Sequence, residues 1–224
     1  MTGRRGACLA LVALLVAVSA ACSGELSPSG GSTTTGRDAA HDGGPLEALA
    51  GAGTTSAVPA REGRTKTVTF GVLLCSADPS QDIELDAVRY DTVPADLATD
   101  WGSAAGPPAI GTYLRSIPTP VSTGHEILPV ASAVGAPHTL DGDVVDLGDA
   151  SSVSIDRPCD GYTDPDRTWP LVELLTVITA DDGGAMATGT HIDYHVGAKR
   201  YTTTVEWKLA ICGPAMPRGA RCRR

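Results

Sequence analysis

Residues 171–212 decide the fold, and their sequence is LVELLTVITADDGGAMATGTHIDYHVGAKRYTTTVEWKLAIC. It holds three segments rich in β-branched and aromatic side chains, at 171–180, 185–196 and 201–212. Asp-Asp-Gly-Gly at 181–184 and Gly-Ala-Lys-Arg at 197–200 are typical of turns between strands. We therefore predict three successive strands that form an antiparallel meander with one face buried.

The second turn predicts a strand register. A loop of four residues would place Val196 opposite Tyr201, Tyr194 opposite Thr203 and Ile192 opposite Val205. In this register mostly apolar side chains meet on one face, and Glu206 lies opposite His191.

Strand patterns also occur upstream. Residues 66–75 (KTVTFGVLLC) alternate with a period of two, and shorter candidates lie at 83–90, 126–131, 143–147 and 151–156. The intervening stretches are rich in Gly and Pro, notably 102–120, and are unsuited to helices. Seven or eight short strands predict an all-β protein built as an antiparallel β-sandwich, with an immunoglobulin-like sandwich as one form.

The overall composition excludes several classes of protein. The chain has 224 residues, with 17 Lys and Arg against 26 Asp and Glu. This length allows one ordinary domain with extensions. The acidic balance argues against a nucleic-acid partner, which would need a basic surface, and no apolar run suits a protein with several membrane spans.

The N-terminus has the pattern of a secretory signal. Arg4 and Arg5 precede an apolar stretch at 7–21, which ends in Ser19-Ala20-Ala21-Cys22. Small residues before a cysteine resemble the lipobox of bacterial lipoproteins, although Ser19 stands where that family favours Leu. The resemblance implies a signal peptide at 1–21, and acyl chains such as palmitate on Cys22 that hold the protein at the outer face of the cell membrane. A secreted protein cut after an alanine, or an uncleaved anchor, are the alternatives.

Residues 22–64 are predicted to be the lipidated Cys22 followed by a flexible linker. Gly, Ser, Thr and Pro make up 22 of the 42 residues at 23–64, a composition that cannot bury enough apolar surface to fold. The β-sandwich domain is then expected at 65–214, and a basic tail at 215–224.

The cysteines predict a disulfide framework. Once Cys8 is removed and Cys22 lipidated, Cys75, Cys159, Cys212 and Cys222 remain, and outside the cytoplasm four thiols form two bridges. Three pairings are open. We favour Cys75–Cys159 with Cys212–Cys222, because the second closes a short loop. Cys75–Cys212 is an alternative, and zinc is disfavoured because no two of these cysteines form a Cys-x-x-Cys pair.

The polar face of 185–196 carries the candidate metal ligands. His191, Asp193 and His195 alternate there, and the predicted register adds Glu206. His191 and His195 are four strand residues apart, roughly 13 Å, too far to share one ion. His191, Asp193 and Glu206 are therefore the candidate metal ligands, but a solvated face with cross-strand polar pairs is favoured. No cofactor and no catalytic residue is predicted, since hydrolase and phosphate-loop motifs are absent.

The layout resembles a set of actinobacterial extracytoplasmic proteins. The matching residues are Val68 to Cys75, Pro158-Cys159, YHVGAKRY at 194–201 and Ile211-Cys212-Gly213. The resemblance implies a disulfide-containing β-domain and carries no activity. We therefore expect a membrane-anchored lipoprotein whose domain binds an unknown protein, wall polymer or small ligand without catalysis. A metal-binding lipoprotein and a cell-wall enzyme are the alternatives.

Overall fold

The computed structural model describes residues 39–41, 43–49, 55–59, 63–92, 108–119, 129–130, 132–149, 154–164 and 166–213. All of them belong to one compact unit, residues 34–224. The predicted signal peptide, Cys22, Cys222 and the basic tail lie outside the described residues. Among the residues that are described, no helix is both long and apolar enough to span a bilayer.

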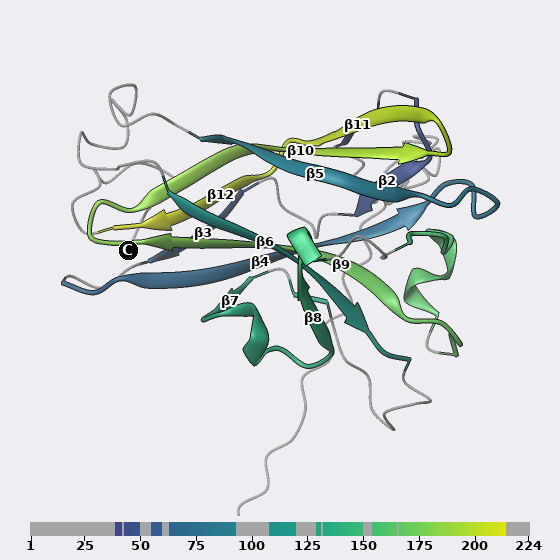
Figure 1. The fold of residues 1–224 in the computed structure, drawn as a ribbon. Coiled ribbons are helices and arrows are strands. Elements are labelled where there is room, and N and C mark those ends of the chain that lie inside the picture. The colour runs from purple at the N-terminus through teal and green to yellow at the C-terminus, as the bar shows by residue number, and fades with distance from the viewer. Residues whose placement is uncertain are drawn as a thin grey trace, which may run out of the picture. The chain divides into compact units, whose positions relative to one another are not determined.

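The described residues contain twelve strands in two sheets. Figure 1 shows how the two sheets are arranged. The first sheet has the order β1 (Ala39–His41), β11 (Lys199–Val205), β10 (Ala185–Val196), β12 (Lys208–Cys212) and β3 (Thr55–Pro59), and β5 (Glu84–Thr92) also pairs with β10. The second has the order β2 (Leu46–Leu49), β4 (Lys66–Ser76), β9 (Leu171–Ala180), β6 (Ala109–Ile117) and β8 (Asp143–Asp146), and β7 (Ala133–Val134) also pairs with β4. Three short 3-10 turns, η1 (Pro137–Thr139), η2 (Leu147–Asp149) and η3 (Asp160–Thr163), lie between strands.

The two sheets pack face to face around one apolar core. Alternate residues of β4 and β9, such as Phe70 and Leu174, meet residues of the first sheet such as Ile192 and Leu209. The ring of Phe70 lies edge-on to Trp207, with centroids 6.2 Å apart. Among the strands that the structure describes, β3 and β12 pair in parallel and the other pairs are antiparallel. The antiparallel β-sandwich predicted from the sequence is thus confirmed.

The strands with the clearest sequence patterns form where expected. The segments predicted at 171–180 and 185–196 are β9 and β10, and that at 66–75 is β4, one residue longer. The shorter candidates at 83–90 and 143–147 are β5 and β8 with shifted ends. Of the other two, 129–130 and 154–156 are described without a strand, and Ser154 forms only an isolated bridge with Glu84.

The predicted three-stranded meander is wrong, because β9 and β10 belong to different sheets. The turn at 181–184 carries the chain from one sheet to the other. β9 is buried on both faces along most of its length, which suits a central strand covered on each side. The sequence LVELLTVITA is accordingly apolar at consecutive positions, where the outer strand of a meander would alternate.

The hairpin β10–β11 is confirmed, but the single strand predicted at 201–212 is wrong, because residues 206–207 interrupt it and divide it into β11 and β12. The register of the hairpin also differs from the predicted one by two residues. The turn consists of two residues, Gly197 and Ala198, so Val196 lies opposite Lys199. Gly197 has φ +56°, which glycine adopts readily and which a tight hairpin turn requires. A shift by two leaves each side chain on its predicted face, but it places Thr204 opposite His191 in place of Glu206.

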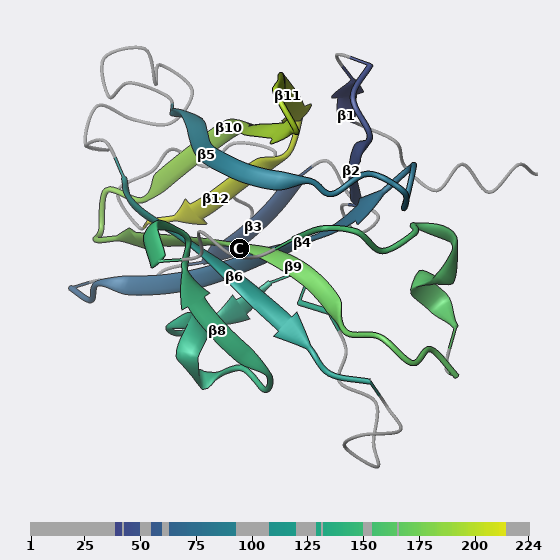
Figure 2. The same cartoon turned by 45° about the vertical axis from the view of Figure 1, so that its right-hand side comes forward.

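The β-domain begins before residue 65. β1, β2 and β3 (Figure 2) all lie in the segment predicted to be a linker. Leu46 on β2 is fully buried in the core. The expectation of a flexible linker is therefore wrong for these strands. They are short and pair with strands far along the chain, as β1 does with β11 and β3 with β12, so local composition carries no trace of them. β6 was missed in the same way, within the Gly- and Pro-rich stretch 102–120.

Limited proteolysis of the full chain should show this boundary. We expect the protected fragment to begin before Leu46, because cutting between β2 and β4 would release a buried strand. N-terminal sequencing or mass spectrometry of the fragment gives its first residue. A protected fragment that begins near residue 65 would contradict the expectation.

Candidate functional site

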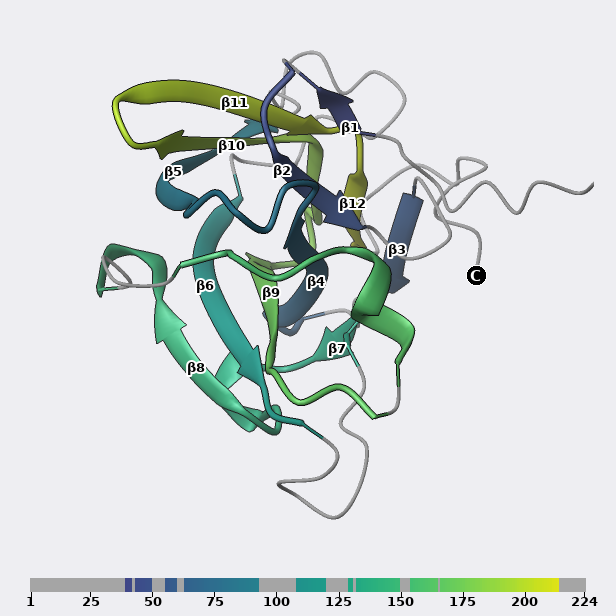
Figure 3. The same cartoon turned by 90° about the vertical axis from the view of Figure 1, so that its right-hand side faces the viewer.

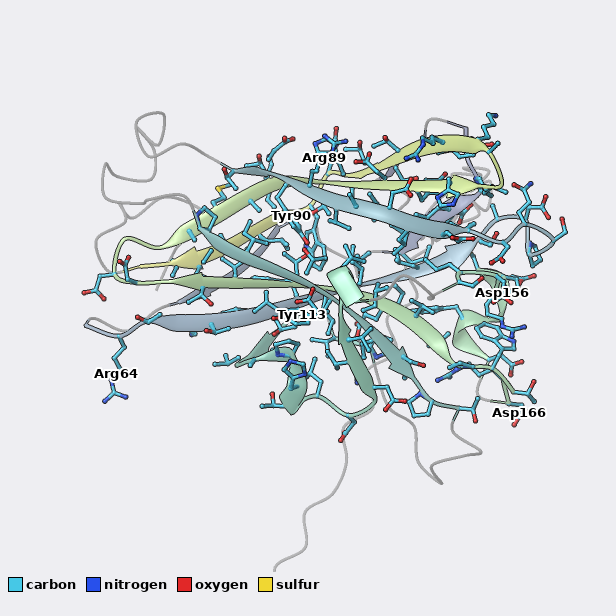
Figure 4. The ribbon with its side chains drawn as sticks, in the orientation of Figure 1. Arg64, Arg89, Tyr90, Tyr113, Asp156 and Asp166 are labelled. Atoms are coloured by element: carbon cyan, nitrogen blue, oxygen red, sulfur yellow. A yellow bond between two sulfur atoms is a disulfide. The ribbon has the colours of Figure 1, made fainter. Side chains whose placement is uncertain are left out.

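The outer face of the first sheet gathers the charged and histidine side chains of three strands. β5, β10 and β11 lie side by side there, and we call this surface the polar face. Its members are Glu84, Asp86, Arg89, Asp91, His191, Asp193, His195, Arg200, Thr202 and Thr204. Figure 4 shows the alternation along β5, where Arg89 points away from the sandwich and Tyr90 points toward the second sheet. The Tyr90 hydroxyl shares hydrogen bonds with Thr112 and Thr176 there. β5 is therefore bonded to β10 within the first sheet and, through Tyr90, to the second sheet.

One cross-strand row is centred on His191. Its Nε2 lies 2.9 Å from Asp91 Oδ2 on β5, and its Nδ1 lies 3.0 Å from Thr204 Oγ1 on β11. Both ring nitrogens are therefore engaged in hydrogen bonds.

The second row is centred on Asp193. Arg89 donates two hydrogen bonds to this carboxylate, of 2.7 and 2.9 Å, and the Thr202 hydroxyl donates a third of 2.7 Å. The pKa of Asp193 is lowered, mainly by the hydrogen bond from Arg89 and further by Thr202. This carboxylate therefore stays ionised, and both of its oxygens accept hydrogen bonds.

The third row is centred on His195. Its Nδ1 lies 2.9 Å from Asp86 Oδ1, and its Nε2 lies 3.5 Å from Glu84 Oε2. Arg200 Nη1 lies 3.0 Å from the other oxygen of Asp86. A shallow open depression lies alongside, lined by Asp86, Asp193, Arg200 and their neighbours.

The three metal-ligand candidates named from the sequence do not converge. His191 and Asp193 share the polar face as predicted, but each is satisfied by other partners, and Glu206 lies between β11 and β12. In the described ranges, one set of three metal-ligating residues has its ligand atoms mutually close: Glu47, Cys75 and Cys159. The two sulfurs of that set are bonded to each other, so it offers no thiolate to a metal.

Thr204, His191 and Asp91 follow the order hydroxyl, imidazole, carboxylate that nucleophilic enzymes use. β11 is flanked by β1 and β10, whose ladders engage the backbone N–H groups around Thr204. We therefore interpret the three residues as a cross-strand row of polar side chains.

A disulfide joins Cys75 at the end of β4 to Cys159, with Cα atoms 5.1 Å apart. This confirms the favoured pairing for these two residues. Cys212 is disulfide-bonded as well, and its predicted partner Cys222 lies outside the described residues.

Beside the Cys75 bridge, Tyr162 and Trp169 line a pocket of about 10 Å³, room for one water molecule at most. Burial raises the pKa of Tyr162 to about 12, with the charge of Glu173 adding to the effect.

A buried ion pair on the outer face of the second sheet was missed from the sequence. Arg115 Nη1 lies 2.8 Å from Glu173 Oε2, and the two side chains are 2% and 0% exposed. The Val130 N–H donates to Glu173 Oε1, and Arg115 Nε donates to the Asp141 carbonyl, both at 2.6 Å. Burial raises the pKa of Glu173, against the lowering effect of the Val130 and Arg115 hydrogen bonds.

This pair connects the second sheet to the segments that lead into two of its edge strands. β7 pairs with β4 and β8 pairs with β6 (Figure 3), and Val130 and Asp141, which precede these strands, are the residues whose backbone groups contact the pair. Gly71 leaves room for the pair, because a Cβ there would collide with Glu173 Oε1 and with the Val130 carbonyl oxygen. The sequence feature that could have indicated the pair is the glutamate within the apolar run LVELL at 171–175. Both side chains are buried and have hydrogen-bond partners within the protein, so we assign the pair a structural role.

Comparisons with known proteins leave the family open. No protein-family profile matches the chain, and no curated protein sequence matches it. Among solved structures, the CooA pilin subunit from enterotoxigenic Escherichia coli aligns over 75% of this chain and 98% of its own, with 11% identity and a TM-score of 0.28. A likeness at this level supports no inference about function.

Proposed function

We propose that the protein is an extracytoplasmic lipoprotein, anchored in the membrane through Cys22, whose β-sandwich binds a partner through the polar face without catalysis. The observation that carries the proposal is the disulfide between Cys75 and Cys159. Disulfides persist in oxidising compartments outside the cytoplasm, which agrees with the export and lipobox pattern before Cys22.

The polar face supports a binding role. Its arginines and carboxylates are held in cross-strand pairs, yet several reach solvent, as Arg200 does with 78% of its side chain exposed. Both signs of charge alternate across three strands, and the face has the hydrogen-bonding groups that a polar protein or wall polymer would contact.

Lipid labelling tests the anchor. In bacteria that process lipoproteins, the full chain should incorporate labelled palmitate. Cys22→Ala should abolish the label and leave an uncut precursor, whereas Cys8→Ala is the matched control and should be labelled normally. Palmitate on the Cys22→Ala variant would contradict the proposal, and an unlabelled protein in the medium would favour the secreted alternative.

Site-specific cross-linking on intact cells tests the binding surface. A photo-crosslinking residue in place of Arg200, on the polar face, should give a discrete adduct. The same residue in place of Val134, which is 68% exposed on β7 and on the other sheet, should give none. Equal adducts from both positions would show that the polar face is not the binding surface.

A further inference from the structure

The His195 ring is oriented so that one nitrogen is available for a ligand. Nδ1 lies 2.9 Å from Asp86 Oδ1, so the carboxylate accepts the Nδ1 proton and fixes the tautomer. The Nε2 lone pair is then directed away from Asp86. A carboxylate behind a histidine in this way is the usual support of a metal-binding imidazole.

The partner of Nε2 is at the distance expected for two ligands of one ion. Nε2 and Glu84 Oε2 are 3.5 Å apart, long for a hydrogen bond. Two ligand atoms about 2.0–2.1 Å from a tetrahedral ion are themselves about 3.3–3.4 Å apart. The separation of the two atoms therefore matches that of two ligands of one small ion.

The charges around the pair also suit a cation. Arg200 pairs with Asp86 at 3.0 Å and neutralises it, while no arginine among the described residues is paired with the nearby Glu84 carboxylate. The Glu84 side chain is 59% exposed, so water can complete the coordination. The His191 row differs, because both of its nitrogens form hydrogen bonds of 2.9 and 3.0 Å.

We propose that His195 Nε2 and Glu84 bind a divalent transition-metal ion, Zn²⁺ or Cu²⁺, with Asp86 orienting the imidazole and water filling the remaining positions. Imidazole with one carboxylate selects these ions over Mg²⁺ and Ca²⁺, which take oxygen ligands. The site differs from the set His191, Asp193 and Glu206 considered from the sequence, and it does not depend on the membrane anchor.

The test is a zinc titration of the full chain, with free thiols alkylated, followed by the imidazole ¹⁵N signals. The His195 Nε2 signal should shift on binding, while the His191 signals stay in place. Glu84→Gln and Asp86→Asn should each weaken the zinc affinity read from the His195 signal, by about tenfold or more for the orienting carboxylate. His191→Ala is the control and should leave that affinity unchanged.

Two results would overturn the proposal. One is a His195 signal that does not move at millimolar zinc. The other is a Glu84→Gln variant with the affinity of the native chain, since Gln keeps the shape of the side chain but removes its charge and replaces one carboxylate oxygen by an NH₂ group.

Discussion

Replacing Arg115 by Met should lower the free energy of unfolding by about 3–5 kcal/mol at neutral pH. The substitution leaves the Glu173 carboxylate, which is fully buried, without its cation, and an uncompensated buried charge is among the costliest defects in a folded protein. Urea unfolding of the full chain gives the difference. Arg200→Met, which removes an exposed ion pair, is the matched control and should cost about 0–1 kcal/mol.

The pH dependence of the stability of Arg115→Met shows whether the unpaired Glu173 carboxylate causes the loss. Burial already raises the pKa of Glu173, and the loss of Arg115 raises it further. The folded variant then holds a proton that the unfolded chain releases above the ordinary Glu pKa of about 4.3. Stability therefore falls as the pH rises from there through the raised pKa, and the loss should be smaller near pH 4 than near pH 7.

A double variant separates the charge from the packing. Arg115→Met with Glu173→Met removes both charges and should recover most of the loss, because apolar replacement of a whole buried pair is often neutral or stabilising. A double variant less stable than Arg115→Met alone would show that packing around the guanidinium, and not the stranded carboxylate, sets the cost.

The second large effect is expected from the Cys75–Cys159 bridge. The two cysteines are 84 residues apart, and closing a loop of that length stabilises the fold by about 4.5 kcal/mol in the chain-entropy estimate, with about 2–4 kcal/mol typical in practice. The paired change Cys75→Ala with Cys159→Ala should lower the unfolding free energy within that range, measured in denaturant without reductant.

Reductant provides the control for this second effect. Because Cys212 is also disulfide-bonded, a reducing agent should destabilise the paired variant further, but less than it destabilises the native chain. If reductant affected both equally, the Cys75–Cys159 bridge would contribute nothing measurable to stability.

Sequence patterns predicted the strands that show a clear hydrophobic pattern within their own residues. β4 and β10 carry their own periodicity, and His191, Asp193 and His195 therefore fell on the correct outer face. Their actual partners on β5, Asp91, Arg89 and Asp86, could not be predicted. The β5–β10 ladder contains two register shifts, so its register depends on packing against the second sheet, to which Tyr90 is hydrogen-bonded.

The remaining misses have a related cause. β1, β2 and β3 are short and acquire their strand form from distant partners, so a composition typical of linkers concealed them. Glu173 lies in an apolar run, and only the folded sheet shows that Arg115 on β6 is directly opposite. Where local preference and tertiary contacts disagree, the contacts decide.

The interleaving of the N-terminal strands with the last ones also constrains how the chain folds. β3 lies parallel to β12 and β1 pairs with β11, so the first sheet cannot close until residue 212 is free to join residue 59. Contacts so distant in sequence form late and slowly. A growing chain would therefore keep the edges of the first sheet open until residues 208–212 have been synthesised, so closure of this sheet is a late step of folding.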